Sequence, residues 1–286
     1  MGTVNERVAL RPELYNSNGP VINVSANSRE LSRIIAMMFY KGEQGFFYDP
    51  NDLSTMFQDA AGTVPVTSVG QPVGLIRDKS GRNNHAYQTT SASRPILRKN
   101  AVTGANYLEF DGSDDFLQTN NIDFTATDKV SLFTGVRNLA DTGQIIAELS
   151  ANTNYTSGSF YLVAGTDGVV GYTSLSRGTT DSGLSQIARS FTYSAPDTAV
   201  LSVKHNISGD LSSMRRNGVV GIDGTGDKGS GNFGNYPLYI GRRGGAYLPF
   251  NGHIYNLIGI GKLTSDTETA ALENELANRT GVTLNV

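Results

Sequence analysis

The sequence predicts an all-β fold in which two antiparallel sheets pack against each other as a sandwich. From residue 43 onward, short apolar runs alternate with clusters of Gly, Asn, Asp and Ser. Gly accounts for 33 of the 286 residues, which indicates many tight turns. Charged residues make up only 17% of the chain, which is low for a helical protein. A series of short strands without helices between them is typical of a sandwich or barrel and argues against a βαβ fold.

Alternating apolar side chains locate the strands. Val130, Leu132 and Val136 lie at alternating positions, so they are expected to share one face of a strand. Asn217 and Gly218 lie between two further candidates and predict a type I′ hairpin turn. The candidate strands cover residues 46–48, 73–77, 107–110, 116–119, 130–137, 144–149, 159–164, 169–173, 199–207, 214–220, 238–241 and 253–260.

The last candidate strand is apolar on both faces. Ile254, Ile258 and Ile260 are expected on one face, with Tyr255 and Leu257 on the other. Because strands buried on both faces lie in the middle of a sheet, this strand is predicted to be central.

A helix is predicted ahead of the sandwich, at about 28–41. Lys41 and Gly42 are typical residues for its C-terminal end. Its apolar residues follow the spacing i, i+3, i+4, i+7 and form one stripe, made of Leu31, Ile34, Ile35 and Met38. This stripe either packs on the chain's own domain or acts as an anchoring or oligomerising element, and the pattern leaves both interpretations open.

A second helix is predicted near the C-terminus. Ser265 and Glu268 have the spacing of a capping box. Leu272 and Leu276 supply its buried stripe, and Gly281 supplies the stop. The chain therefore divides into an N-terminal attachment or oligomerisation arm and a sandwich domain, at residues 1–42 and 43–286.

Composition excludes several classes of function. The net charge of −3 provides no broad positive field for nucleic acid. The chain has no Cys, so it has no disulfide and no thiolate site. No apolar run approaches the roughly 18 residues of a membrane span. The first residues also lack a secretory signal pattern, which predicts synthesis in a cytosol.

Several segments, taken in order, resemble the concanavalin A-like (laminin-G-like) jelly-roll superfamily, in the version found in bacteriophage and prophage structural proteins. They are an aspartate-rich opening segment at 45–59, a second at 71–86, the strand and Phe-Asp-Gly-Ser-Asp-Asp loop within 107–117, and a late Gly-rich hairpin and strand at 235–255. The resemblance implies a two-sheet jelly roll, and it implies a phage particle as the setting.

The resemblance leads to three functional hypotheses. The first is a non-enzymatic virion protein of the tail-fibre or receptor-binding type, which displays the sandwich for attachment to host-surface glycans. Residues 1–42 would then contact other virion proteins, and a closed homo-oligomer such as a trimer is expected. The second is a capsid decoration or cement protein without a sugar ligand. The third is a glycan depolymerase.

The residues argue against an enzyme. Glycoside hydrolysis needs two carboxylates across one sugar bond. Glu109 and Glu148 are the only glutamates between residues 44 and 267. The histidines His85, His205 and His253 accompany no Gly-x-Ser-x-Gly elbow, so nucleophilic catalysis is not expected either.

Two polar clusters could bind calcium, which takes six to eight oxygen ligands. One consists of Asp111, Asp114 and Asp115, and the other of Asp78, Ser80 and Asn83. The alternative, which the sequence favours, is that these side chains cap their own turns. Calcium is therefore a candidate cofactor only at the Asp111 cluster, and no other cofactor is expected.

A sugar ligand would contact aromatic rings and amide or charged groups. The chain has no Trp but 13 Tyr. Candidates lie in or beside the Gly-rich hairpin and in one other loop, and they are Tyr236, Tyr239, Arg242, Arg243, Tyr247, Asn154 and Tyr155.

Overall fold

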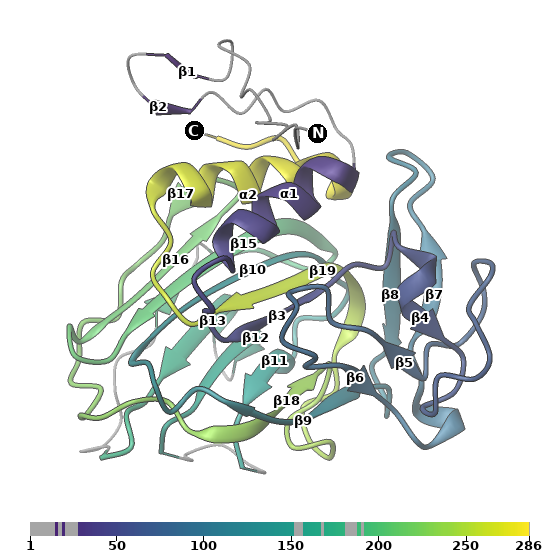
Figure 1. Ribbon diagram of the computed structural model, residues 1–286, viewed down its shortest axis with the longest axis horizontal. Helices are drawn as coiled ribbons and strands as arrows, with labels where there is room; N and C mark the ends of the chain where they lie inside the picture. The colour runs from purple at the N-terminus through teal and green to yellow at the C-terminus, as the bar shows by residue number, and fades with distance from the viewer. Residues whose placement is uncertain are drawn as a thin grey trace, which may run out of the picture.

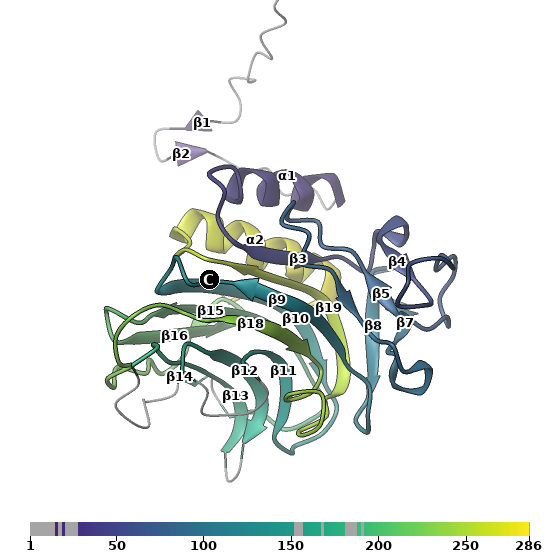
Figure 2. The ribbon, with the colours of Figure 1, turned by 60° about the horizontal axis from the view of Figure 1, so that its bottom comes forward.

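A computed structural model describes residues 15–16, 19–20, 28–151, 157–166, 169–180, 188–189 and 192–285. In this part of the chain, two large antiparallel sheets face each other across one core (Figures 1 and 2). Helices α1 (Ser28–Met38) and α2 (Asp266–Thr280) lie together outside one of the sheets. The prediction of an all-β two-sheet sandwich flanked by two helices is confirmed.

The sheet beneath the helices has eight strands, and β3 (Gly45–Tyr48) pairs with its central strand β19. The other seven follow the order β17 (Val219–Val220), β16 (Leu211–Arg216), β15 (Asp197–Asn206), β10 (Lys129–Asn138), β19 (Asn251–Ile260), β8 (Asn106–Asp111) and β7 (Ile96–Lys99).

The opposite sheet has nine strands. Their order is β14 (Ala188–Arg189), β13 (Val169–Ser176), β12 (Phe160–Thr166), β11 (Gln144–Leu149), β18 (Asn235–Ile240), β9 (Leu117–Asp123), β6 (Ala86–Tyr87), β5 (Leu75–Ile76) and β4 (Met56–Phe57). A separate hairpin joins β1 (Tyr15–Asn16) and β2 (Gly19–Pro20). Short 3₁₀ turns occur at Leu53–Thr55 and Ser91–Ser93.

The turn between β16 and β17 has the predicted geometry. Arg216 pairs with Val219, so the loop contains only Asn217 and Gly218. Both have positive φ, at 52° and 83°, as a type I′ turn requires. The Asn-Gly pair thus sets the register of this edge hairpin.

Strand β19 is central, as predicted, but its faces differ from simple alternation. Ile254 and Leu257 lie in the core between the sheets, whereas Ile258 and Ile260 lie under the helices. The prediction that Ile254 shares a face with Ile258 is therefore wrong. The register to β10 passes from Asn256 directly to Ile254, which leaves Tyr255 as the extra residue of a β-bulge. A bulge shifts every later side chain to the opposite face.

Helix α1 packs on the chain's own domain. Its four stripe residues are buried in a second core cluster with side chains of α2 and of the eight-stranded sheet. At its C-terminal end, Arg82 Nη2 donates a 2.8 Å hydrogen bond to the carbonyl oxygen of Phe39. The assignment of Leu31, Ile34, Ile35 and Met38 as attachment residues is corrected accordingly, because the domain itself covers them. Contacts of residues 1–27 with other proteins stay a prediction.

Helix α2 begins and ends as its sequence predicts. The side chain of Ser265 accepts from the amide of Glu268 at 3.2 Å, and the carboxylate of Glu268 accepts from the amide of Ser265 at 2.8 Å. Gly281 ends the helix at φ 81°, in the left-handed region. No helix of the described ranges combines the length and apolar character that crossing a membrane demands.

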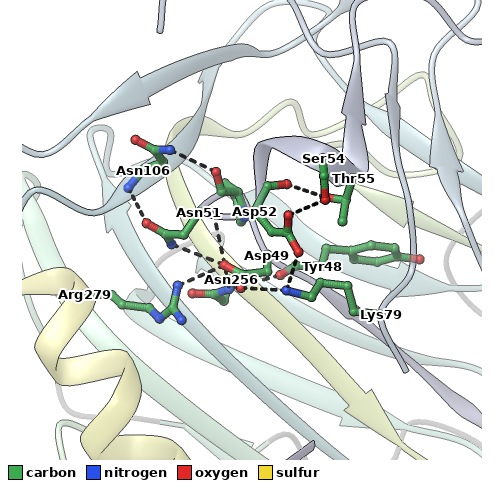
Figure 3. A network of polar contacts seen from close by, with 11 residues as sticks. Tyr48, Asp49, Asn51, Asp52, Ser54, Thr55, Lys79, Asn106, Asn256 and Arg279 are labelled. Carbon is green, nitrogen blue, oxygen red and sulfur yellow. Dashed lines mark hydrogen bonds and ion pairs between the residues drawn. The ribbon is translucent and has the colours of Figure 1, made fainter. Parts of the chain in front are cut away.

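The opening Asp-Pro-Asn-Asp segment after β3 forms a buried polar network (Figure 3). Asp49 accepts hydrogen bonds from Arg279 Nη1 at 2.9 Å and from Asn256 Nδ2 at 3.0 Å. Lys79 Nζ lies 3.3 Å from the other carboxylate oxygen of Asp49 and 2.8 Å from Asp52. The network joins β3, β19 and α2, so the polar side chains of this loop stabilise the fold.

Candidate functional site

A row of polar and aromatic side chains crosses the outer face of the nine-stranded sheet. On β18, Leu238 and Ile240 point into the core, so Tyr239 between them points outward. Direct strand pairing places it between Gln118 of β9 and Glu148 of β11. The same register extends the row to Tyr87 on β6 and Tyr161 on β12. We call these five side chains the outer row: Tyr87, Gln118, Tyr239, Glu148 and Tyr161.

An ion pair lies at the centre of the outer row. Arg243 Nε donates to Glu148 Oε2 at 2.7 Å, and the two side chains are 12% and 1% exposed. Ser150 Oγ donates to the other oxygen of Glu148 at 2.8 Å. The guanidinium carbon of Arg243 lies 5.2 Å from the ring centroid of Tyr161, a cation–π distance. The pair is therefore nearly buried, carries little net charge, and presents the partly exposed guanidinium of Arg243 beside an aromatic ring.

The hydroxyl of Tyr239 stays protonated. Burial raises its pKa, and the charge of Glu148 and the neighbouring Tyr87 raise it further. The phenol therefore remains a hydrogen-bond donor over the physiological pH range. Tyr87 completes this side of the row, and its hydroxyl contacts Asn120 at 3.1 Å.

The Gly-rich hairpin folds back beside the outer row. Arg243 and Tyr247 exchange backbone hydrogen bonds of 2.7 and 3.0 Å, which closes a tight loop. Gly245 has φ 66°, and a Cβ there would lie 3.0 Å from the ring of Phe116. Glycine is therefore required both by the backbone and by the close approach. Tyr247 is left 63% exposed at the tip.

The structure unites some of the predicted ligand residues and separates others. Tyr239, Arg243 and Tyr247 lie together around the hairpin. Arg242 belongs to the same hairpin, and its Nε is buried without a hydrogen-bond partner among the described residues. Tyr236 instead packs against the core between the sheets. Asn154 and Tyr155 lie outside the described residues.

Sequence reasoning missed Tyr87, Gln118 and Tyr161 as members of this site, and it considered Glu148 only as a catalytic candidate. Each lies at an outward position of its own strand, and the alternation of core-facing and outward-facing residues along a strand can be recognised from the sequence. Nothing local, however, indicates that β6, β9, β18, β11 and β12 are neighbours, since that order follows from the closing of the whole sheet.

The aspartate cluster forms as predicted, with one oxygen of each of Asp111, Asp114 and Asp115 within 4.8 Å of the others. Asp111 Oδ1 accepts from the amides of Ser113 and Asp114 at 2.8 and 3.2 Å, as in an Asx turn. Ser93 Oγ donates to Asp114 at 2.5 Å. Burial, followed by the charge of Asp111, raises the pKa of Asp115 to about 7. These contacts explain the cluster as a turn, and calcium there stays a prediction.

The second polar cluster is a structural turn. Asp78 accepts hydrogen bonds from the amides of Phe47, Ser80 and Asn84 at 2.8–3.0 Å. Asn83 occupies the left-handed region at φ 61°, where Asn is tolerated. The loop thereby holds β3 against the segment before β6. Among the described residues, Asp78 belongs to no group of three carboxylate or histidine side chains that could hold a metal ion.

The two candidate catalytic glutamates point away from each other. Leu108 and Phe110 on β8 face the core, so Glu109 lies on the outer face of the eight-stranded sheet. Glu148 lies on the outer face of the nine-stranded sheet, with two sheets between them. Packed sheets are about 10 Å apart, so these two carboxylates do not face a common bond.

Neither a protein-family model nor a curated protein sequence matches this chain. Solved structures do resemble it. A GH54 α-L-arabinofuranosidase soaked with a cyclic sulfate inhibitor superposes with a TM-score of 0.56 at 13% identity, covering 86% of this chain and 65% of that one. A second is domain 4 of AbnA, a GH43 extracellular arabinanase from Geobacillus stearothermophilus, in complex with arabinotriose. It superposes with a TM-score of 0.51 at 14% identity, covering 80% of this chain and 98% of that one.

The ligand-binding domain of botulinum neurotoxin serotype D in complex with N-acetylneuraminic acid gives a TM-score of 0.50 at 14% identity, covering 78% of this chain and 51% of that one. The chain spans about half the length of several of the solved structures that it resembles. At these identities the likeness shows a shared fold alone, a two-sheet β-sandwich.

Proposed function

We propose that this chain is a non-enzymatic glycan-binding protein and that its ligand contacts the outer row of the nine-stranded sheet. The observation that carries the proposal is the Glu148–Arg243 pair, set between Tyr239 and Tyr161. A sugar presents hydroxyl groups and an apolar ring face. The guanidinium and phenol donate, the side-chain carbonyl of Gln118 accepts, and the tyrosine rings supply apolar contact. Proteins of similar fold are described with arabinotriose and N-acetylneuraminic acid.

The absence of catalysis is part of the proposal, although some proteins of similar fold are glycosidases. Retaining enzymes hold their two carboxyl groups roughly 5 Å apart, and inverting enzymes roughly 6.5–9.5 Å apart, on either side of one bond. Glu109 and Glu148 point outward from opposite sheets. Glu148 is also 1% exposed and held by Arg243 and Ser150, which does not suit a general acid. Release of reducing ends from a polysaccharide by the purified protein would contradict this part.

The biological setting that we propose is a bacteriophage particle, on which the sandwich is displayed for host attachment. This setting is supported by the resemblance of segments 45–59, 71–86, 107–117 and 235–255 to virion jelly rolls. Particles lacking the protein should adsorb poorly to host cells. If such particles adsorb normally but break sooner under heat or osmotic shock, the protein is a decoration protein instead.

Glycan binding is tested with exposed tyrosines, whose replacement spares the core. Tyr247→Ala removes the tip of the hairpin, and Tyr40→Ala removes a 72% exposed tyrosine of the α1 end as a matched control. On an oligosaccharide array that includes arabinotriose, Tyr247→Ala should weaken binding about tenfold, equivalent to about 1.4 kcal/mol. Equal binding by both variants and the wild type would remove the hairpin from the site.

A further inference from the structure

The outer face of the eight-stranded sheet is only partly covered by the helices. α1 and α2 lie over the part that contains Phe133, Ile258 and Ile260, and β7 and β8 extend beyond them (Figures 1 and 2). The C-terminal end of α2 reaches Gly135, where a Cβ would lie 2.6 Å from Thr280 Cγ2. Past this point, the outward side chains of four strands form what we call the Tyr107 patch: Arg98, Tyr107, Glu109, Arg137, His253 and Tyr255.

The aromatic part of the patch is closely packed. The rings of Tyr107 and His253 stack with centroids 4.1 Å apart and planes 15° apart. Tyr107 also lies 5.2 Å from Tyr255 at a tilt of 47°. Both partners belong to β19, where His253 and Tyr255 flank the core residue Ile254 and so lie on the outer face. Tyr255 is 2% exposed, and its hydroxyl accepts from Asn100 Nδ2 at 2.9 Å. It therefore forms a buried, fixed support for the partly exposed rings of Tyr107 and His253.

The polar groups around these rings are unevenly paired. Arg98 Nε lies 3.0 Å from Glu109 Oε1, so one positive charge is offset. His253 Nε2 is 3.9 Å from Glu109, beyond hydrogen-bond length, and its Nδ1 is buried without a partner in the described chain. Arg137, directly opposite His253 in the register, is exposed and makes no side-chain hydrogen bond or ion pair with any residue that the structure describes.

The local charge is therefore positive. Arg137 is not offset, and Lys99 follows Arg98 at the end of β7. Burial, followed by the opposing influences of Glu109 and of Arg137 and Arg98, lowers the pKa of His253 to about 4, so this ring is neutral. Asp111 shares the face, but its carboxylate is turned toward the backbone amides of its own loop.

We propose that the Tyr107 patch is a second binding surface and that it takes an acidic sugar. The carboxylate of a uronic or sialic residue would pair with Arg137, since a guanidinium is shaped for a carboxylate. The sugar ring would lie against Tyr107 and His253. Asn251, which faces Asp111 across the strand pair, would be within the same surface to meet hydroxyl groups. This surface lies on the opposite side of the sandwich from the outer row and does not depend on it.

An acidic sugar fits the patch better than an acidic peptide. A peptide segment would pair its backbone with an open strand edge. Within the patch, β10, β19 and β8 pair with strands on both sides, and the outer edge of β7 bonds to the backbone of residues 70–73. A ring with one carboxylate matches one unpaired guanidinium beside an aromatic surface.

The test uses the full chain and two probes, trigalacturonate and its neutral methyl ester. Calorimetric titration at low salt measures the affinity of the protein for each probe. We expect the acid to bind and the ester to bind at least about tenfold more weakly, the size expected for a lost charged hydrogen bond. Arg137→Gln should weaken binding of trigalacturonate by a similar factor. Lys99→Gln, which removes the same charge from the neighbouring end of β7, should change binding less than about twofold if contact rather than net charge decides.

Several outcomes would overturn the second surface. They are equal binding of acid and ester, equal effects of Arg137→Gln and Lys99→Gln, loss of acid binding in Tyr247→Ala, or tighter binding of a glutamate-rich peptide than of trigalacturonate. If neutral glycans bind through Tyr247 while trigalacturonate does not bind, only the second surface is wrong. If acid binding through Arg137 persists while no neutral glycan of the array binds the protein, only the outer-row proposal is wrong.

Discussion

Asp49 and Arg279, 230 positions apart in the sequence, meet as a buried ion pair at 2.9 Å. The carboxylate follows β3 near the start of the sandwich, and the guanidinium belongs to the last turn of α2 (Figure 3). Burial alone would raise the pKa of Asp49, but the charges of Arg279 and Lys79 and the hydrogen bonds from Asn256 and Asn51 outweigh it, so the pKa is lowered.

Asp49→Asn should destabilise the fold by roughly 3–5 kcal/mol, because Arg279 would be left buried without its counter-charge. Urea unfolding of the variant and the wild type measures this difference. Asp223→Asn, at an exposed position, is the control and should leave the transition unchanged. Because the pKa of Asp49 is lowered in the folded state, its contribution should also be lost as pH falls through that folded value. A variant as stable as the control would show that the pair is energetically neutral.

Leu31→Ala should destabilise the domain by roughly 2–5 kcal/mol, since the side chain is fully buried between α1 and the rest of the second core. Met37→Ala removes a side chain of similar size from the same helix, but one that is 60% exposed. Its effect should be small. Thermal and urea unfolding of both variants give the comparison. If Leu31→Ala leaves stability intact and impairs assembly with another protein, the stripe is an attachment surface after all.

Stability should fall on acidification because of His205. Its ring is buried between Ser174 Oγ and Ser212 Oγ, each 2.8 Å away. Burial, followed by the charge of Lys228, lowers its pKa to about 3, from 6.5 in the unfolded chain. Between these values the unfolded state binds more protons, so stability decreases as pH falls from 6.5 toward 3, by at most about 1.4 kcal/mol per pH unit.

His205→Asn should reduce this slope, whatever it does to stability at neutral pH. The measurement is the free energy of unfolding at several pH values between 7 and 4 for the wild type and the variant. His253, with a pKa of about 4, adds a slope of the same sign that remains in the variant. Identical slopes in both proteins would show that His205 protonates as readily folded as unfolded.

Asp115 should affect the pH dependence of stability in the opposite direction to His205. Its folded pKa of about 7 lies above the unfolded value of 3.8, so the folded state binds more protons between them. Stability therefore falls as pH rises from 3.8 to 7. Asp115→Asn should remove this loss and stabilise the protein at pH 8 relative to the wild type. A destabilised variant at pH 8 would contradict the expectation.

The same position tests the calcium prediction. A bound ion would stabilise the ionised carboxylates, so millimolar calcium at pH 8 would raise the melting temperature of the wild type and not of Asp115→Asn. Equal response of the two proteins would leave the cluster as a turn without an ion.

Local pattern predicted much of this protein. The alternation in the strands, the Asn217-Gly218 turn, the capping box of Ser265 and Glu268, and the stop at Gly281 all depend on neighbours a few residues away. The strand that became β19 was predicted to be central because both of its faces are apolar. Part of the site was also readable, since Tyr239, Arg243 and Tyr247 lie close together in the sequence.

Only the tertiary structure decided the rest. The bulge at Tyr255 placed Ile258 and Ile260 on the helix-covered face. The apolar stripe of α1, whose partner the pattern did not identify, packs on the domain itself. The neighbours of Tyr239 and Glu148, the opposite orientation of Glu109, and the meeting of Asp49 with Arg279 all follow from which distant strands pair. The sequence by itself determined the two helices and the longer strands apart from β7, because they are set by local spacing. It did not indicate β7 or the two-residue strands β4, β6 and β14. It did not determine the partners of the strands, since pairing is chosen by burial and hydrogen bonding summed over the whole sandwich.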